Sequence, residues 1–173
     1  ASDMTFKIVA TRAEDATSVF FDKSDLKQDN YDVIKASCCV PFINKPYVID
    51  GVPYYDGGIM NPIPVQHALD AGCERILVIL TKPKDFRMKE SSGPHLMARL
   101  SSDHAEFHDA IQERGSKYNE QLERALELEK EGIVEIIAPD DIGHMKILTR
   151  DPAKLDALYQ EGFAKSKKLF EKQ

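Results

Sequence analysis

Residues 52–64 read VPYYDGGIMNPIP, and this stretch decides the fold of the chain. Asp56 follows a short apolar strand here and directly precedes Gly57 and Gly58. Two glycines permit backbone conformations that other residues avoid, and they leave room for another segment or a substrate to approach the backbone. A carboxylate at this place can be held by neighbouring amides while it faces a cleft. Taken alone, Asp-Gly-Gly is also typical of an ordinary turn.

The residues around this stretch predict a hairpin before it and a short helix after it. Residues 47–49 and 52–55 are strand-like, and they flank Asp50-Gly51, a dipeptide typical of tight hairpin turns. A helix is expected over residues 65–71, with Gly72 as the residue that closes it. Both elements place Asp56 at the end of a strand, next to a sharp change of chain direction.

Along the rest of the chain, strand-like and helix-like segments alternate, which is typical of α/β proteins. The predicted strands cover residues 6–11, 18–21, 76–81 and 133–138, and the predicted helices cover 31–39, 95–114, 117–130 and a last segment that begins at Asp151-Pro152. Residues 76–81 are apolar without alternation, as expected for a strand covered on both faces in a parallel sheet. Because we find no internal repeat and no linker, we expect one domain.

The amino-acid composition excludes several classes of function for this chain. The 173 residues include 42% hydrophobic and 30% charged residues, and the formal net charge is -6. An acidic chain is a poor partner for nucleic acid, whose binding depends on cationic side chains at the phosphates. The longest apolar run, residues 76–80, is far shorter than the ~18 residues of a membrane span. The first residues lack the basic and apolar blocks of a signal peptide, so we expect a cytoplasmic protein.

The motifs around residue 56 form a larger pattern. Its parts are Ala-Ser-x-x-x-Pro-Phe at 36–42, the hairpin with Asp50-Gly51, and Tyr-x-Asp-Gly-Gly-x-x-Asn-Pro-x-Pro at 54–64. In this combination the chain resembles the C-terminal half of the patatin-like phospholipases. Residues 9–11 add to the similarity, and residues 76–84 and 149–152 are similar to a bacterial branch of that family. On this resemblance, residues 1–173 are the C-terminal portion of one patatin-like domain.

The resemblance implies a three-layer α/β/α fold and a serine acyl hydrolase that acts on a lipid or another ester, with peripheral membrane contact and without cofactor or metal. In this chemistry a serine attacks the ester carbonyl, and an aspartate accepts the serine proton directly. Asp56 matches the aspartate of this dyad, as general base in acylation and general acid toward the leaving group. Gly57 and Gly58 would shape its loop.

The nucleophile of such a dyad has no match in this sequence. It should lie in a G-x-S-x-G turn between strand and helix, after a glycine-rich oxyanion loop. Gly115-Ser116 lacks the second glycine and is expected between two helices, and Ser37 belongs to a helix end. We therefore expect the nucleophile-bearing part to precede residue 1, and the chain alone to be inactive. Its apolar sheet edge and open helix faces favour self-association. A non-catalytic binding or assembly domain with the same fold is the alternative.

Two further groups of side chains are candidate sites, the three cysteines and a pair of histidines. Cys38, Cys39 and Cys73 lie among apolar or small residues, so we expect buried, reduced cysteines in the core. They lack the C-x-x-C spacing of a metal site. His104 and His108 are one helical turn apart, but the order of a zinc-binding H-E-x-x-H helix is not met. We expect these histidines on a solvated helix face.

Overall fold

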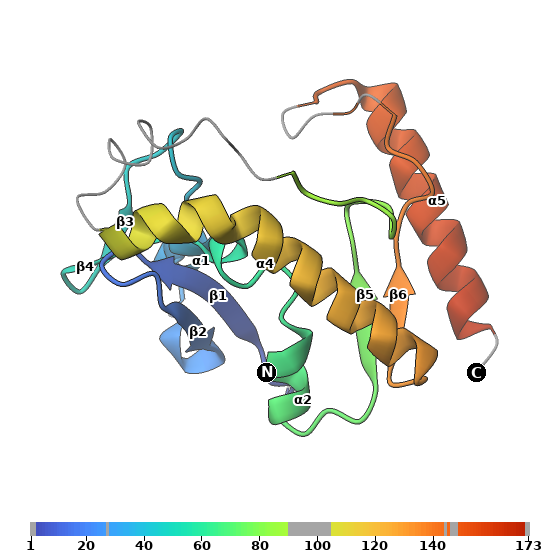
Figure 1. The fold of residues 1–173 in the computed structure, drawn as a ribbon, viewed down its shortest axis with the longest axis horizontal. Helices are drawn as coiled ribbons and strands as arrows, with labels where there is room; N and C mark the ends of the chain where they lie inside the picture. The colour runs from blue at the N-terminus through green and yellow to red at the C-terminus, as the bar shows by residue number, and fades with distance from the viewer. Residues whose placement is uncertain (1–2, 27, 90–104, 144, 146–148, 172–173) are drawn as a thin grey trace. The chain divides into compact units, whose positions relative to one another are not determined.

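The computed structural model describes residues 3–26, 28–89, 105–143, 145 and 149–171, and its fold is mixed α/β as expected (Figure 1). Its strands are β1 (Lys7–Arg12), β2 (Ser18–Asp22), β3 (Tyr47–Ile49), β4 (Val52–Asp56), β5 (Ile76–Ile79) and β6 (Val134–Ile137). Its α-helices are α1 (Asp32–Ser37), α2 (Val65–Asp70), α4 (Ala105–Lys130) and α5 (Pro152–Phe170), and the 3-10 helices are η1 (Lys23–Asp25) and η2 (Gly57–Ile59).

The chain forms two compact units. The first unit comprises residues 1–63 and 88–121, and the second comprises residues 64–87 and 122–173. Helix α4 contributes its first part to the first unit and its last part to the second.

The first unit contains a four-stranded antiparallel sheet in the order β2-β1-β4-β3. Strand β1 lies between β2 and β4, and its Ala10 pairs with Asp56 at the end of β4. The predicted hairpin is confirmed, since β3 and β4 pair across a turn in which Asp50 has φ 49° and Gly51 has φ 83°. Positive φ at both central residues gives a turn whose twist matches that of the strands.

The core of the first unit forms where β4 meets the first part of α4. Tyr55 and Phe107 are both fully buried, and their rings stack with centroids 4.6 Å apart. Ala110 and Ile111 of α4 and Ile59 of η2 belong to the same buried cluster. Because Tyr55 directly precedes Asp56, its burial fixes the end of β4 from which the carboxylate projects.

In the second unit, β5 and β6 form a two-stranded parallel sheet, which agrees with the parallel sheet expected for residues 76–81. The expectation that β5 is covered on both faces is wrong. Leu77 and Ile79, which point to the same face, are 41% and 71% exposed. The physical reason is that α5 packs along β6 and leaves this face of β5 open (Figure 1).

The predicted helix ends agree with the structure better than the predicted helix lengths. Asp151 caps α5, its side chain accepting the backbone N–H of Ala153 at 3.1 Å, and Pro152 is the first helical residue. Gly72 has φ 86° and closes α2 as expected. The predicted helix over residues 31–39 is the shorter α1.

The predicted break between residues 114 and 117 is wrong, because α4 continues through Gly115. A glycine inside a helix costs about 1 kcal/mol. In α4 this cost is outweighed, since Ile111, Gly115 and Tyr118 lie at helical spacing and are all buried. The part of that prediction over residues 95–104 lies outside the described residues.

Candidate active site

Asp56 is the last residue of β4, and both of its backbone polar groups are engaged. Its N–H donates to the carbonyl of Cys39 at 2.9 Å. Its carbonyl accepts a hydrogen bond from the Thr11 hydroxyl at 3.0 Å, and Thr11 is fully buried. Since Thr11 belongs to β1 and Cys39 follows α1, two separate elements hold the backbone from which the carboxylate extends.

The carboxylate of Asp56 is half-buried and is bonded on one side only. Its Oδ1 accepts the backbone N–H of Gly58 at 2.7 Å, so that Asp56 caps η2. Within the described part of the chain, no hydrogen bond reaches Oδ2. One oxygen is therefore fixed by the loop while the other retains its capacity to accept a proton.

Gly57 is required at its position by a close approach of the backbone. A Cβ at this residue would lie 2.4 Å from the carbonyl oxygen of Val9 in β1. Real Cβ atoms do not come this close to an oxygen, so only glycine fits against β1 here. The prediction that the two glycines allow close approach of another segment is borne out for Gly57, and the segment is β1.

Helix α4 contacts the loop that follows Asp56. The guanidinium of Arg114 donates to the carbonyl of Gly58 at 3.3 Å. Gln121 donates to the carbonyl of Met60 at 3.0 Å and accepts the N–H of Ile63 at 2.9 Å. The side chains of this helix thus satisfy backbone groups of residues 58, 60 and 63 in the loop that follows Asp56.

Neither serine weighed as a nucleophile lies in a suitable turn. Ser37 is the last residue of α1, and Ser116 is an exposed residue inside α4. An activated serine needs a base within hydrogen-bond reach. In the described part of the chain, no serine hydroxyl bonds to Asp56. The structure therefore places Asp56, Gly57 and Gly58 together in one loop. Among the described residues, no serine forms a hydrogen bond with the Asp56 carboxylate.

The cysteine prediction is correct in one part and wrong in another. All three cysteines are free, and Cys39 is buried, its thiol donating to the carbonyl of Lys45 at 2.8 Å. Burial raises the pKa of this thiol. Cys38 and Cys73 are exposed, contrary to expectation. Each directly follows the closing turn of a short helix, where the side chain projects away from the core.

The histidine pair is only partly described, because His104 lies outside the described residues and His108 is half-buried on α4. Over the ranges that the structure describes, no three His, Cys, Asp or Glu side chains are placed to hold a metal ion. In the same ranges, no helix has both the length and the apolar character needed to cross a bilayer.

Two segments of the chain match known protein families. Residues 3–69 match the patatin-like phospholipase family, and this match includes Asp56, Gly57 and Gly58. Residues 104–173 match a second family, described as a domain of unknown function (DUF6363). The resemblance noted at residues 76–84 and 149–152 thus lies outside the patatin-like match.

Among individual proteins, the chain is similar to the uncharacterized protein YjjU of Escherichia coli (strain K12). The two are 36% identical over 86 residues, which is 49% of this chain and 24% of that protein. The chain therefore spans about a quarter of the length of the curated relative that it matches.

Proposed function

We propose that this chain is the aspartate-bearing part of a patatin-like serine acyl hydrolase, in which Asp56 is the dyad carboxylate and a lipid or another ester is the substrate. One observation carries the proposal. Within the segment that matches the patatin-like phospholipases, Asp56 has one carboxylate oxygen held by the N–H of Gly58 and the other unbonded by any described residue. This is the arrangement that a fixed proton acceptor needs.

The chemistry assigns two proton transfers to Asp56 during acylation. In acylation, a serine oxygen bonds to the ester carbonyl carbon while Asp56 takes the serine proton. As the C–O bond to the leaving alcohol breaks, the same proton passes to that alcohol. An aspartate with a reference pKa of ~3.9 is a weak base for a hydroxyl. The reaction therefore needs an oxyanion hole and a serine placed at a helix N-terminus.

We propose that the serine and the oxyanion loop belong to a part of the protein outside these 173 residues. Together with this chain, that part completes a three-layer α/β/α domain. Two observations support this. The sequence contains no G-x-S-x-G, and the relative in Escherichia coli is about four times as long as the segment it shares with this chain. On this proposal the chain alone is inactive.

A serine-directed fluorophosphonate probe tests the dyad. We expect no labelling of this chain, and labelling of the full-length protein at a serine outside it. In the full-length protein, Asp56→Asn should abolish turnover, because the amide cannot accept the proton. Asp50→Asn is the matched control, since it removes one carboxylate from the exposed turn of the same hairpin. Stoichiometric labelling of Ser37 or Ser116, or full activity of Asp56→Asn, would contradict the proposal.

The alternative is a non-catalytic binding or assembly domain that kept the fold. The observation that favours it is the absence of a serine partner for Asp56 in the described part of the chain. The same probe separates the two functions. The non-catalytic function is supported if the full-length protein takes up no probe while a known serine esterase in the same tube is labelled.

We further propose that the chain self-associates, that it is cytoplasmic, and that it contacts membranes only at their surface through its substrate. Self-association is supported by the exposed apolar face of β5, with Leu77 and Ile79, and by exposed Tyr159 and Phe163 on α5. Gel filtration over a range of concentrations tests it. A monomer at the highest concentration would contradict it.

A further inference from the structure

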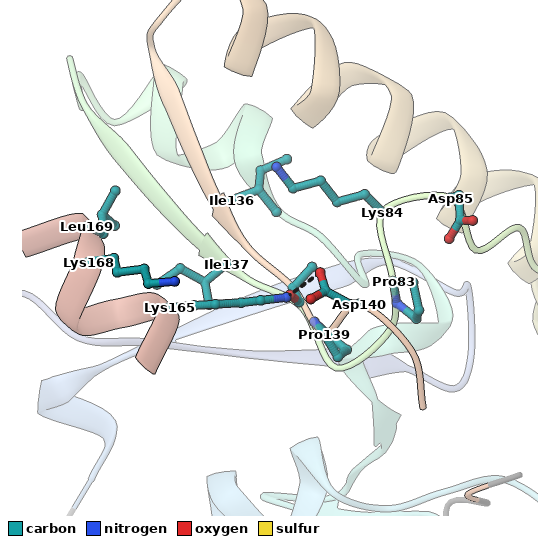
Figure 2. A pocket seen from close by; sticks show the side chains of 11 residues that line it. Pro83, Lys84, Asp85, Ile136, Ile137, Pro139, Asp140, Lys165, Lys168 and Leu169 are labelled. Atoms are coloured by element: carbon teal, nitrogen blue, oxygen red, sulfur yellow. Dashed lines mark hydrogen bonds and ion pairs between the residues drawn. The ribbon is translucent and has the colours of Figure 1, made fainter. Parts of the chain in front are cut away.

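A hollow of about 530 Å³ lies outside the carboxyl ends of the two parallel strands in the second unit (Figure 2). Residues 83–85, which come shortly after β5, and residues 136–140, at and beyond the end of β6, form two of its sides. The third side is the C-terminal half of α5. Ligands of α/β proteins bind at this end of a parallel sheet, and the volume lies within the usual range of ligand pockets.

Most of the wall is apolar. Ile136, Ile137 and Ala138 line the hollow from β6 and the residue that follows it, and Leu169 lines it from α5. Pro83 and Pro139 add two further apolar side chains to the lining (Figure 2). Such a wall offers contact to an alkyl chain and no hydrogen bonds from its side chains.

Two of the three lysines in the wall are committed to other partners. Lys165 bonds to the carbonyl of Ala138 at 2.7 Å, to Asp140 at 2.6 Å and to Glu161 at 2.7 Å, which uses all three of its N–H donors. Lys84 is paired with Glu129 of α4 at 2.5 Å. The Lys84 ammonium is thus neutralised by one carboxylate, whereas Lys165 is shared by two carboxylates in a group with one net negative charge.

Lys168 is different, because its ammonium has no hydrogen bond or ion pair with any described residue. Figure 2 shows its side chain extending from α5 toward Ile137. The Asp85 carboxylate lies at the opposite end of the hollow in that view, and Asp140 is already bonded to Lys165. Among the residues that line the hollow, Lys168 is therefore the cation that no carboxylate pairs, and it is the group left to contact an anionic head.

We propose that this hollow binds an amphipathic anion, whose carboxylate or phosphate head contacts Lys168 and whose alkyl chain lies along Ile137 and Leu169. The site lies wholly within the second unit and does not depend on the role of Asp56. A head group alone would gain one solvent-exposed charge contact, and a neutral chain would leave Lys168 unused. The hollow fits a ligand that carries both features.

NMR titration of the 173-residue chain tests this proposal, with decanoate and decyl phosphate below their micelle concentrations and with inorganic phosphate alone. We expect both amphiphiles to shift the methyl signals of Ile136, Ile137 and Leu169, and phosphate alone to bind far more weakly. The tighter of the two amphiphiles identifies the head group. Lys168→Gln should weaken binding by about fivefold, the upper range for one exposed charge pair. Lys168→Arg should retain it.

Lys154→Gln is the matched control, because it removes the same charge from the same helix at a residue outside the hollow. The affinity of Lys154→Gln for decanoate and decyl phosphate should equal that of the unmodified chain. The proposal is overturned if Lys168→Gln binds as tightly as Lys154→Gln, or if phosphate alone binds as tightly as decyl phosphate. It is equally overturned if the shifted signals are those of Tyr159 and Phe163 on the exposed face of α5, because the amphiphile then coats an apolar surface.

Discussion

The carbonyl of Val9 occupies the space that a side chain at Gly57 would need. A Cβ on Gly57 would lie 2.4 Å from that oxygen and 2.8 Å from the Cβ of Val9. Strand β1 therefore lies directly against the backbone of Gly57. In the same strand, the Thr11 hydroxyl donates a hydrogen bond to the carbonyl of Asp56. Through Val9 and Thr11, β1 therefore contacts the first two residues of the Asp-Gly-Gly loop.

Gly57→Ala should destabilise the chain by about 2 kcal/mol or more, because the added methyl group meets backbone that cannot rotate away. The free energy of urea unfolding measures this effect. Gly162→Ala is the control, since Gly162 lies inside α5 with no atom within 4 Å of a Cβ and needs no positive φ. That change should stabilise the chain by about 0.5–1 kcal/mol. Equal effects of the two substitutions would show that β1 does not constrain Gly57.

Thr11→Val should loosen the Asp-Gly-Gly loop, because the buried carbonyl of Asp56 loses its hydroxyl donor at a cost of about 1–3 kcal/mol. The informative measurement is amide hydrogen exchange at Gly58, whose N–H bonds to the Asp56 carboxylate. We expect faster exchange in Thr11→Val and near-normal exchange in Thr11→Ser, which keeps the hydroxyl.

The control for this prediction is Ile8→Val, which removes a methyl group from a buried residue of the same strand at a cost of about 0.5–1.5 kcal/mol. It should lower global stability without a specific effect at Gly58. If Ile8→Val accelerates exchange at Gly58 as much as Thr11→Val does, the Thr11 hydroxyl has no special role in holding the loop.

Local signals in the sequence predicted the hairpin and the helix ends, because each depends on residues close together in the chain. Asp50-Gly51 adopts the positive φ angles that its turn requires, and Asp151-Pro152 starts α5 as expected. The contact between Thr11 and Asp56 was not predicted. It joins residues 45 positions apart and depends on the register between β1 and β4, which no local pattern encodes.

The wrong predictions have tertiary causes as well. The sequence predicts a helix break at Gly115, but packing of the α4 face outweighs the low helix propensity of glycine. The apolar run of β5 indicated a strand covered on both sides, yet burial depends on what packs there, and α5 covers β6 instead. For the candidate site, the sequence identified Asp56 and its two glycines through the motif. It could not show that Oδ1 alone is bonded within the described residues.

The three cysteines should differ in reactivity toward iodoacetamide near pH 8. Cys38 and Cys73 are exposed and should each take up one adduct in the folded chain. Cys39 should not react, because it is buried, its thiol donates to Lys45, and burial raises its pKa so that little thiolate forms. Intact mass should show two adducts under native conditions and three in urea. A third adduct on the folded chain would show that Cys39 is accessible.

Stability should fall as the pH rises from about 10 to about 12. Burial raises the pKa of Tyr55 to about 12, above the reference value of about 10 for an unfolded tyrosine. Below pH 10 the phenol is protonated in both states, so its contribution to stability is complete. Between the two values the unfolded state loses its proton while the folded state keeps it, so the free energy of unfolding decreases.

Urea unfolding at pH 9, 10, 11 and 12 measures this decrease. Tyr55→Phe should reduce the pH dependence of the free energy of unfolding, because phenylalanine has no phenolic proton to lose. Part of the pH dependence should remain, because burial also raises the pKa of Tyr54. Tyr159→Phe is the control, because it removes the same hydroxyl group from a residue that is 64% exposed on α5 and lies outside the buried cluster of Tyr55. If Tyr55→Phe and the unmodified chain lose stability in parallel over this range, the Tyr55 phenol is not shielded in the core.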